Sequence, residues 1–156
     1  EAGLPAARAL TLQPGAVPAF AEVVEALGLP VFVKPARQGS SVGVSKVATE
    51  ADYDAALAEG FRHDRTLLAE EFIAGREIEC AVLEQPDGTL FVSRPGEIVP
   101  AQSHGFYSYD AKYIDEDGAA LKVPAELPAA VETEMREMAA RAERLLPASG
   151  PVSERQ

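Results

Sequence analysis

The feature that most constrains the fold is a pair of short strand patterns joined by a loop rich in glycine and serine. Residues 31–35 form an apolar run that ends in lysine and proline, and residues 44–47, which begin and end in valine, resemble a returning strand. Between them lies the sequence Gly39-Ser40-Ser41-Val42-Gly43. Small residues of this kind suit a tight connection between antiparallel strands. We therefore predict a β-hairpin whose tip can move.

Helical and strand patterns alternate along the rest of the chain. Apolar residues recur with helical spacing in 20–27 and 127–146, and Thr49 with Asp52 resembles a capping box for a helix that ends near Gly60. Further strands are expected at residues 66–72, 77–85, 89–93 and 97–99. The sequence therefore predicts an α+β fold of two small antiparallel sheets that each carry helices.

The same patterns predict how the chain is divided. We expect one lobe at residues 1–75, part of a second lobe at 76–146, and a disordered tail at 147–156. Residues 101–121 are rich in aromatic side chains and only weakly periodic. A loop of this length within a compact domain is usually functional or disordered, and the aromatic content favours a functional, mobile loop.

Composition excludes several classes of function. The chain has 14 Lys and Arg against 25 Asp and Glu, a formal net charge of −11. Nucleic acids and anionic membranes need a positive surface, so neither is an expected partner, although a local basic pocket for a nucleotide remains compatible with this charge. The one cysteine, Cys80, is expected in the core, and no apolar run reaches the ~20 residues of a membrane span. A cytoplasmic protein is expected.

Lys34 and the loop that follows it could bind phosphate. A lysine at the end of an apolar strand has a packed stem and a fixed ammonium, and small loop residues let backbone N–H groups approach phosphate oxygens. The alternative is a flexible hairpin tip beside an incidental lysine, because such loops are common. The usual P-loop and dinucleotide-binding motifs are absent. No metal-binding motif is present either, and His63 is expected to be a solvated surface residue.

A second group of residues could bind a nucleoside. Glu70 and Glu71 end an apolar strand pattern, a short apolar segment follows, and Glu77 comes next. A purine needs a hydrogen-bonding edge and an apolar slot, and a ribose needs an acceptor for its hydroxyls. The alternative is a set of charged residues at a solvated strand end.

Four motifs stand in order along the chain. They are V-x-V-K-P-A-R-x-G-S-S-V-G-V-S-K-V at 31–47, E-x-F-I-x-G-x-E at 70–77, P-G-E-I-V-P at 95–100, and F-Y-S-Y-D-A-K-Y at 106–113. Together they resemble the ATP-grasp fold and, within it, the D-alanine–D-alanine ligase family. The resemblance implies a small antiparallel lobe with helices and the first part of a larger lobe.

The resemblance also implies a role for each matching residue. In the family, the lysine matching Lys34 contacts the α- and β-phosphates, and the loop matching 39–43 closes over the nucleotide. The acid matching Glu70 and the backbone through 73 hold adenine, and the acid matching Glu77 binds ribose. The implied nucleotide-binding residues are Lys34, Gly39, Ser40, Ser41, Val42, Gly43, Glu70, Glu71, Phe72, Ile73, Glu77 and Lys112. The implied catalytic residues are Ser41, Lys112, which reaches the γ-phosphate, and Tyr113, which helps to close the site.

The resemblance implies a reaction and also shows departures from the family. The implied cofactors are ATP and Mg²⁺, the substrate is D-alanine, and the full-length protein is expected to be a homodimer. The family's N-terminal domain and its C-terminal magnesium ligands have no counterpart here, so we expect a fragment that carries the nucleotide half. Two alternatives remain open: a catalytically inactive nucleotide-binding fragment, and another ATP-grasp ligase that joins a carboxylate to an amine.

Overall fold

The computed structural model describes residues 3–100 and 119–145, which form two compact units. The first unit holds residues 6–75 together with 100 and 119–120, and the second holds residues 3–5, 76–99 and 121–145. No helix in the described ranges is long and apolar enough to cross a membrane. Each unit is described by itself below.

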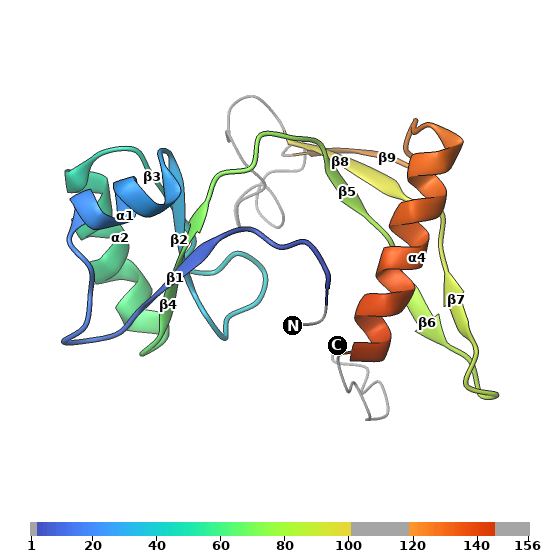
Figure 1. Cartoon of the computed structure of the whole chain (residues 1–156), viewed down its shortest axis with the longest axis horizontal. Helices are drawn as coiled ribbons and strands as arrows, with labels where there is room; N and C mark the ends of the chain where they lie inside the picture. The colour runs from blue at the N-terminus through green and yellow to red at the C-terminus, as the bar shows by residue number, and fades with distance from the viewer. Residues whose placement is uncertain (1–2, 101–118, 146–156) are drawn as a thin grey trace. The chain divides into compact units, whose positions relative to one another are not determined.

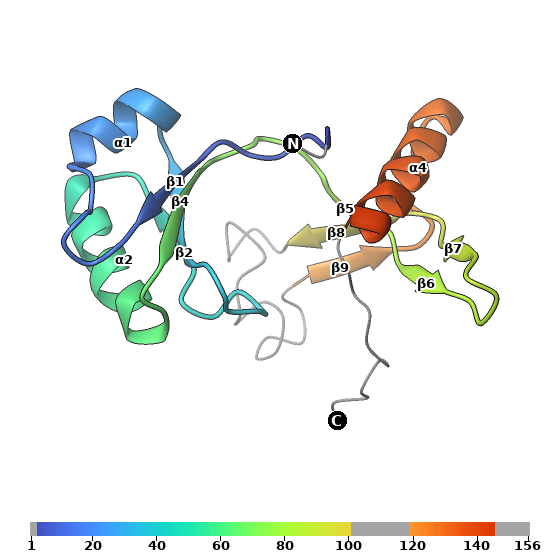
Figure 2. The same ribbon diagram turned by 60° about the horizontal axis from the view of Figure 1, so that its bottom comes forward.

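The first unit is a four-stranded antiparallel sheet with two helices on one face (Figures 1 and 2). The strand order is β1-β4-β2-β3. The strands are β1 (Ala9–Leu12), β2 (Val31–Pro35), β3 (Ser45–Val47) and β4 (Leu67–Glu71), and the helices are α1 (Phe20–Leu27) and α2 (Glu50–His63). Alternate strand residues point at the helices and form the core, which includes Leu12, Val23, Val31, Val33, Val47, Tyr53, Leu67 and Ala69.

Both helices begin or end at the residues that the sequence predicted. Gly28 ends α1 with a φ of 77°, and its N–H donates to the carbonyl of Val24. Thr49 caps α2 by accepting a hydrogen bond from the backbone N–H of Asp52, whose carboxylate accepts from the backbone N–H of Thr49. The predicted hairpin of β2 and β3 is confirmed.

The prediction that α2 ends near Gly60 is wrong, because the helix continues to His63. Gly60 lies inside the helix, where a Cβ atom would come within 2.8 Å of the Leu67 side chain. Leu67 is fully buried. The glycine therefore allows the helix to approach β4 closely and does not mark its end.

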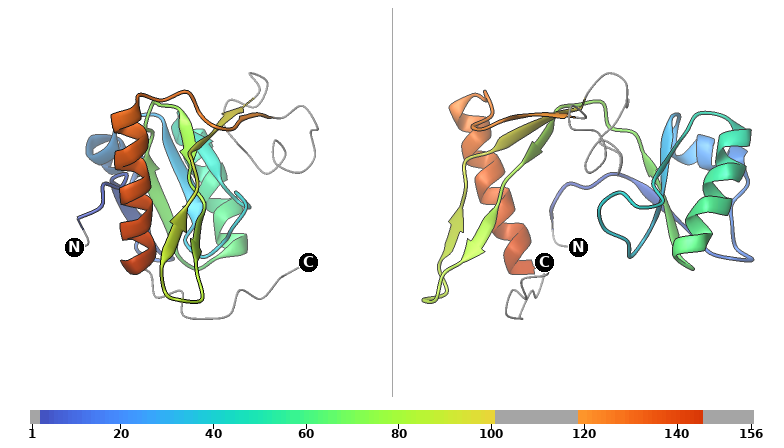
Figure 3. Two further views of the ribbon diagram at one scale, coloured as in Figure 1. Left: turned by 90° about the vertical axis from the view of Figure 1, so that its right-hand side faces the viewer. Right: turned by 180° about the vertical axis from the view of Figure 1, so that it is seen from behind.

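The second unit contains two separate small sheets and one helix (Figure 3). Strands β5 (Glu77–Glu79), β8 (Gly96–Pro100) and β9 (Ala119–Lys122) form one sheet, in that order, and β6 (Val82–Glu84) pairs with β7 (Leu90–Val92) in a hairpin. Helix α4 (Ala129–Leu145) packs along this hairpin. The Arg76 guanidinium binds both carboxylate oxygens of the buried Glu97, at 2.7 and 2.8 Å.

Several other expectations need correction. The described residues form three sheets and not two. The expected strand at 77–85 is two strands, because β5 pairs with β8 while β6 pairs with β7. Residues 119–121 belong to β9 and not to a loop, and strand β1 was not predicted at all. No residue of α4 is buried, so its apolar stripe is only half covered. The predicted tail at 147–156 lies outside the described residues.

Candidate functional site

The face of the first sheet that points away from the helices carries the polar and aromatic side chains. Val31 and Val33 of β2 are buried against the helices. Successive side chains of a strand point to opposite faces, so Phe32 and Lys34 point to the other face of the sheet. The register places Lys46 of β3 and Glu70 of β4 on either side of Phe32. We call this surface the outer face.

Lys34 and Glu70 form an ion pair on the outer face. The Lys34 ammonium lies 2.7 Å from a carboxylate oxygen of Glu70, and the two side chains are 37% and 23% exposed. Leu68 stands opposite Lys34 in the register, so the pair is diagonal across β2 and β4. The residue expected at the phosphates and the residue expected at adenine are therefore neighbours.

Two aromatic rings lie beside this ion pair. The ring centroids of Phe32 and Phe72 are 6.1 Å apart, and the ring planes are tilted by 42°. The ammonium of Lys46 lies 5.1 Å from the centre of the Phe72 ring, at a distance typical of a cation–π contact. Phe72 is 42% exposed, so part of its ring remains open to a flat ligand such as a purine.

Glu71 is held by Arg8 from strand β1's N-terminal side. The Arg8 guanidinium donates from Nε at 2.6 Å, and the Arg8 backbone N–H donates to the other carboxylate oxygen at 2.8 Å. These hydrogen bonds hold the pKa of the Glu71 carboxyl below its usual range. The Glu71 backbone N–H donates to the carbonyl of Arg8, so this N–H belongs to the sheet. Arg8 thus contacts both the side chain and the backbone N–H of Glu71, and these contacts fix the end of β4.

The loop after β2 has an unusual backbone. Ser40 and Ser41 have φ values of 56° and 59°, and Gly43 has 71°. Positive φ is uncommon for residues with a Cβ atom, and two in succession are costly unless the surroundings fix them. Such a backbone turns N–H groups toward one side and can form a concave site for an anion. This is the loop that the sequence predicted for phosphate.

The remaining predicted residues divide into three groups. Ile73 follows Phe72 and is exposed, in the first unit. Glu77 lies at the start of β5 in the second unit. Lys112 and Tyr113 lie outside the described residues.

The sequence analysis missed residues that support this face. Arg8, Phe32, Lys46 and Asp64 were not singled out, and His63 was expected to be solvated. The His63 ring is instead partly covered, because it packs on Gly43 and its Nε2 lies 2.8 Å from the Glu59 carboxylate, which accepts the hydrogen bond. The alternation of β2 and β3 could have identified Phe32 and Lys46, whereas Arg8 and Asp64 lie far along the chain from the residues that they contact.

The second unit has a groove of about 270 Å³ but offers less chemistry. Ile98, Leu121 and Val123 line it, and two of its three charged residues, Arg94 and Glu97, are in ion pairs with Glu132 and Arg76; the third is Glu79. Across residues 3–100 and 119–145, no group of three or more His, Cys, Asp or Glu could hold a metal ion. The candidate site is therefore the outer face of the first unit with its loop.

Comparison with known proteins gives consistent matches. Residues 1–152 match the family model described as "D-ala D-ala ligase C-terminus". D-alanine–D-alanine ligase A of Brucella suis is 65% identical over 146 residues, which are 94% of this chain and 41% of the relative. D-alanine–D-alanine ligase A of Mesorhizobium japonicum is 57% identical, again over 94% of this chain and 41% of the relative.

Solved structures match as well. The VanG D-Ala:D-Ser ligase of Enterococcus faecalis superimposes with a TM-score of 0.74 at 33% identity, over 92% of this chain and 40% of that chain. D-alanyl-alanine synthetase A of Vibrio cholerae superimposes with a TM-score of 0.74 at 30% identity, over 92% of this chain and 44% of that chain. The chain thus spans about two fifths of the length of the curated relatives that it matches. Its fold is that of the corresponding part of these ATP-grasp enzymes, as the α+β prediction required.

Proposed function

This chain belongs to the D-alanine–D-alanine ligase family, and from that premise we propose that it forms most of the nucleotide-binding half of an ATP-dependent ligase. The proposed reaction joins two D-alanine molecules. In it, ATP supplies the phosphoryl group that converts the first carboxylate into an acyl phosphate, which the amine of the second D-alanine then attacks.

The observation that carries the proposal is the arrangement of Lys34 in the first unit. Its ammonium is held at the outer face by Glu70 at 2.7 Å, on the strand that leads directly into the loop at 39–43. A cation and a loop of left-handed residues on one hairpin are suited to a triphosphate. Phe72 offers an exposed apolar surface for a purine on the same face.

Each of these groups has a defined role in the proposed reaction. The charge of Lys34 offsets negative charge on the phosphates, and such electrostatic stabilisation provides most of the catalysis in phosphoryl transfer. The loop, with Ser41 near its tip, excludes water that would hydrolyse an acyl phosphate. Glu70 and the backbone of 71–73 recognise adenine.

The proposal also gives roles to three residues outside the outer face and its loop. Glu77 binds ribose, Lys112 reaches the γ-phosphate, and Tyr113 closes the site, as the family resemblance implies. The described residues do not fit a resident magnesium ion, since none of their carboxylates are clustered for it. We therefore derive no step through magnesium from this chain. A cytoplasmic location and a homodimer are part of the same proposal.

The test of the proposed function is the replacement of Lys34. Lys34→Ala should weaken ATP binding by this chain at least ~10-fold, and lower the ligase activity of a longer protein that contains it at least ~100-fold, since a transition-state charge contact is lost. Arg62→Ala is the matched control, because it removes one positive charge from α2, which covers the opposite face of the sheet. Equal effects of the two substitutions would reject the assigned role of Lys34.

Substrate choice separates the remaining alternatives. A longer protein that contains this chain is supplied with ATP and with D-alanine alone, or with D-alanine plus D-serine or D-lactate, and the products are identified by mass spectrometry. D-alanyl-D-alanine as the main product supports the proposal. A mixed product would assign another second substrate, and ATP binding without any product would favour a nucleotide-binding fragment.

A further inference from the structure

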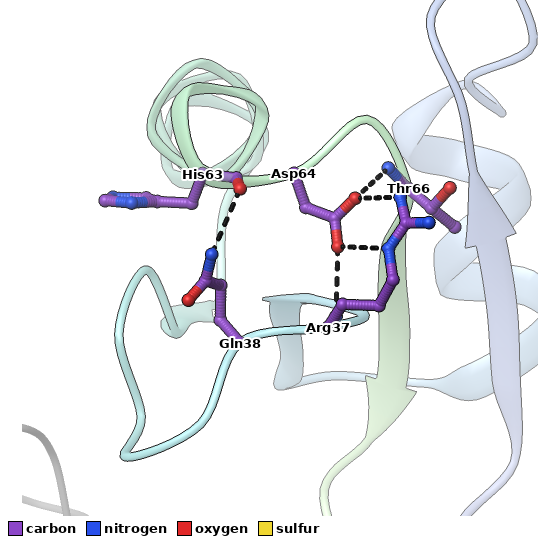
Figure 4. A network of polar contacts seen from close by, with 5 residues as sticks. All are labelled: Arg37, Gln38, His63, Asp64 and Thr66. Carbon is purple, nitrogen blue, oxygen red and sulfur yellow. Dashed lines mark hydrogen bonds and ion pairs between the residues drawn. The ribbon is translucent and has the colours of Figure 1, made fainter.

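Both ends of the loop at 39–43 lie against the last turn of α2 and the residue after it. Figure 4 shows the contacts before the loop. Before the loop, Arg37 contacts Asp64, and the side-chain amide of Gln38 donates to the carbonyl of His63 at 3.2 Å. At the far end, Gly43 lies against the His63 ring. All of these contacts are made by two adjacent residues, His63 and Asp64, which we call the α2 seat.

The Asp64 side chain is built to hold the first end of the loop. It is only 4% exposed, whereas that of Arg37 is 72% exposed. One carboxylate oxygen accepts from the Arg37 backbone N–H at 3.0 Å and from Nε at 3.1 Å. The other accepts from Nη2 at 2.6 Å and from the Thr66 backbone N–H at 3.1 Å. These groups hold the pKa of the Asp64 carboxyl far below its usual range, mainly through the hydrogen bond from the Arg37 side chain, so the carboxylate is charged at neutral pH.

The backbone contact distinguishes this arrangement from an ordinary surface ion pair. A surface pair between two side chains leaves the main chain free to move and contributes little. Here the carboxylate binds the main-chain N–H of Arg37 as well as its guanidinium. The backbone N–H of the preceding residue, Ala36, donates to the Thr66 carbonyl at 2.9 Å. The chain is thus fixed at successive residues where it leaves β2.

The second end is fixed by close packing. A Cβ atom on Gly43 would lie 2.8 Å from Cδ2 of His63 and 3.0 Å from Cγ of Pro35. The glycine is therefore pressed between two rings. The His63 ring is itself held by Glu59, one helical turn earlier, at 2.8 Å between Nε2 and a carboxylate oxygen.

We propose that the α2 seat fixes both ends of the loop, and that Asp64 and His63 are positioning residues for the triphosphate although neither touches it. This inference rests on the proposed function, because it assigns the loop to phosphate binding. With its ends fixed, fewer arrangements of the loop compete with the one that binds the ligand. Less conformational entropy is then lost on binding, so affinity rises without any new contact.

A competing explanation is that Arg37 contacts phosphate itself. The two explanations predict opposite results for Asp64→Asn. If Arg37 acts directly, removing a negative charge beside it leaves ATP affinity unchanged or raises it, since one carboxylate no longer opposes the anion. If Asp64 positions the loop, affinity falls in spite of the more favourable charge.

The experiment combines ATP titration calorimetry with amide hydrogen exchange on the whole chain. Asp64→Asn keeps the size of the side chain and an oxygen that can accept from Thr66, but loses the charged contact with Arg37. We expect about 5–10-fold weaker ATP binding and at least ~10-fold faster exchange of the 38–43 amides without nucleotide. Arg37→Ala should give the same changes, and the double variant should add little to either.

Two further arms make the outcome decisive. Arg62→Ala is the control for lost charge, since its side chain is 74% exposed and pairs only with Glu59 among the contacts of the described chain. Exchange and ATP affinity within about 2-fold of the unsubstituted chain in both Asp64→Asn and Arg37→Ala would overturn the inference. If Asp64→Asn does not fold, the amide exchange of Arg37→Ala without nucleotide decides, because Arg37 is exposed and loss of a direct phosphate contact would not speed exchange of the free loop.

The two proposals also fail in different ways. Exchange of the free chain reports on the seat whether or not ATP binds. Absence of ATP binding by the unsubstituted chain, with exchange faster in the variants, would reject the proposed function and keep the seat as an anchor of the loop. Loss of binding in Lys34→Ala but not in Asp64→Asn would reject the seat and keep the function.

Discussion

Substitution of Gly43 by alanine tests the backbone of the loop most directly. Gly43 has a φ of 71°, where a residue with a Cβ atom loses about 1–2 kcal/mol. The added Cβ atom would also meet His63 at 2.8 Å and Pro35 at 3.0 Å. Overpacking of this kind costs about 1–3 kcal/mol.

The size of the effect depends on what can move. The His63 ring is partly exposed and can turn away, but Pro35 is buried in β2 and its ring cannot. Part of the overlap therefore persists together with the whole backbone cost. We expect Gly43→Ala to lower the free energy of unfolding by about 2–3 kcal/mol, between the backbone cost alone and the full sum.

The assay is equilibrium urea unfolding followed by far-ultraviolet circular dichroism. Gly39→Ala is the matched control for stability, because the same loop offers it open space and no left-handed φ, so it should change stability by less than about 0.5 kcal/mol. Adding His63→Ala to Gly43→Ala should relieve the contact with the His63 ring and leave the backbone cost of about 1–2 kcal/mol together with the overlap with Pro35. Equal stability of Gly43→Ala and Gly39→Ala would refute the packing of Gly43 on His63.

Three further predictions concern packing and pH. Leu67→Ala empties a fully buried position and should cost about 2–5 kcal/mol, whereas Leu83→Ala on an exposed position should cost less than about 0.5 kcal/mol, both measured by urea unfolding. Gly60→Ala gains about 1 kcal/mol of helix propensity but overpacks Leu67 by about 1–3 kcal/mol, so thermal unfolding should show no gain and up to about 2 kcal/mol of loss. The Arg76 hydrogen bonds lower the pKa of Glu97 from its ordinary 4.5, so their stabilisation is complete above that pH and is lost as the pH falls through the lower folded value. Unfolding midpoints should therefore decline below pH 4.5, and less steeply in Glu97→Gln; equal slopes would contradict this.

The elements that were predicted correctly are those whose signals are local. The capping box of Thr49 and Asp52 and the C-terminal Gly28 act within one helical turn, so three or four residues of sequence contain the whole signal. The hairpin of β2 and β3 is also local, because its two strands are joined by one short loop. These signals needed no knowledge of the rest of the fold.

The errors arose where a partner far along the chain decides the structure. Residues 77–85 alternate without interruption, yet the first part pairs with β8 and the second with β7, and alternation alone does not identify a partner strand. Strand β1 has only four residues, too few for a clear pattern, and it forms against β4 nearly 60 residues later. The sequence pattern predicts a helix end near Gly60, because the pattern does not reveal that the Leu67 side chain packs against this glycine in the fold.

The candidate site shows the same division. Lys34 and the loop were found because the chemistry lies in one contiguous segment, and Glu70 was found because it ends a strand pattern. The residues that hold this chemistry in place come from elsewhere: Arg8 is 63 residues from Glu71, and Asp64 is 27 residues from Arg37. A motif therefore indicates which groups are present, while the surrounding fold determines where they stand.

The charge of the chain illustrates why both kinds of information are needed. A net charge of −11 opposes every long polyanion, but charges more than about 8 Å away are largely screened at physiological salt. Binding of a compact anion is thus governed by the few groups next to it. On the outer face these include Lys34 and Lys46, while the nearest carboxylate, Glu70, is already paired with Lys34. Because that pair holds the ammonium at the face, the nucleotide binding that we propose is compatible with an acidic chain.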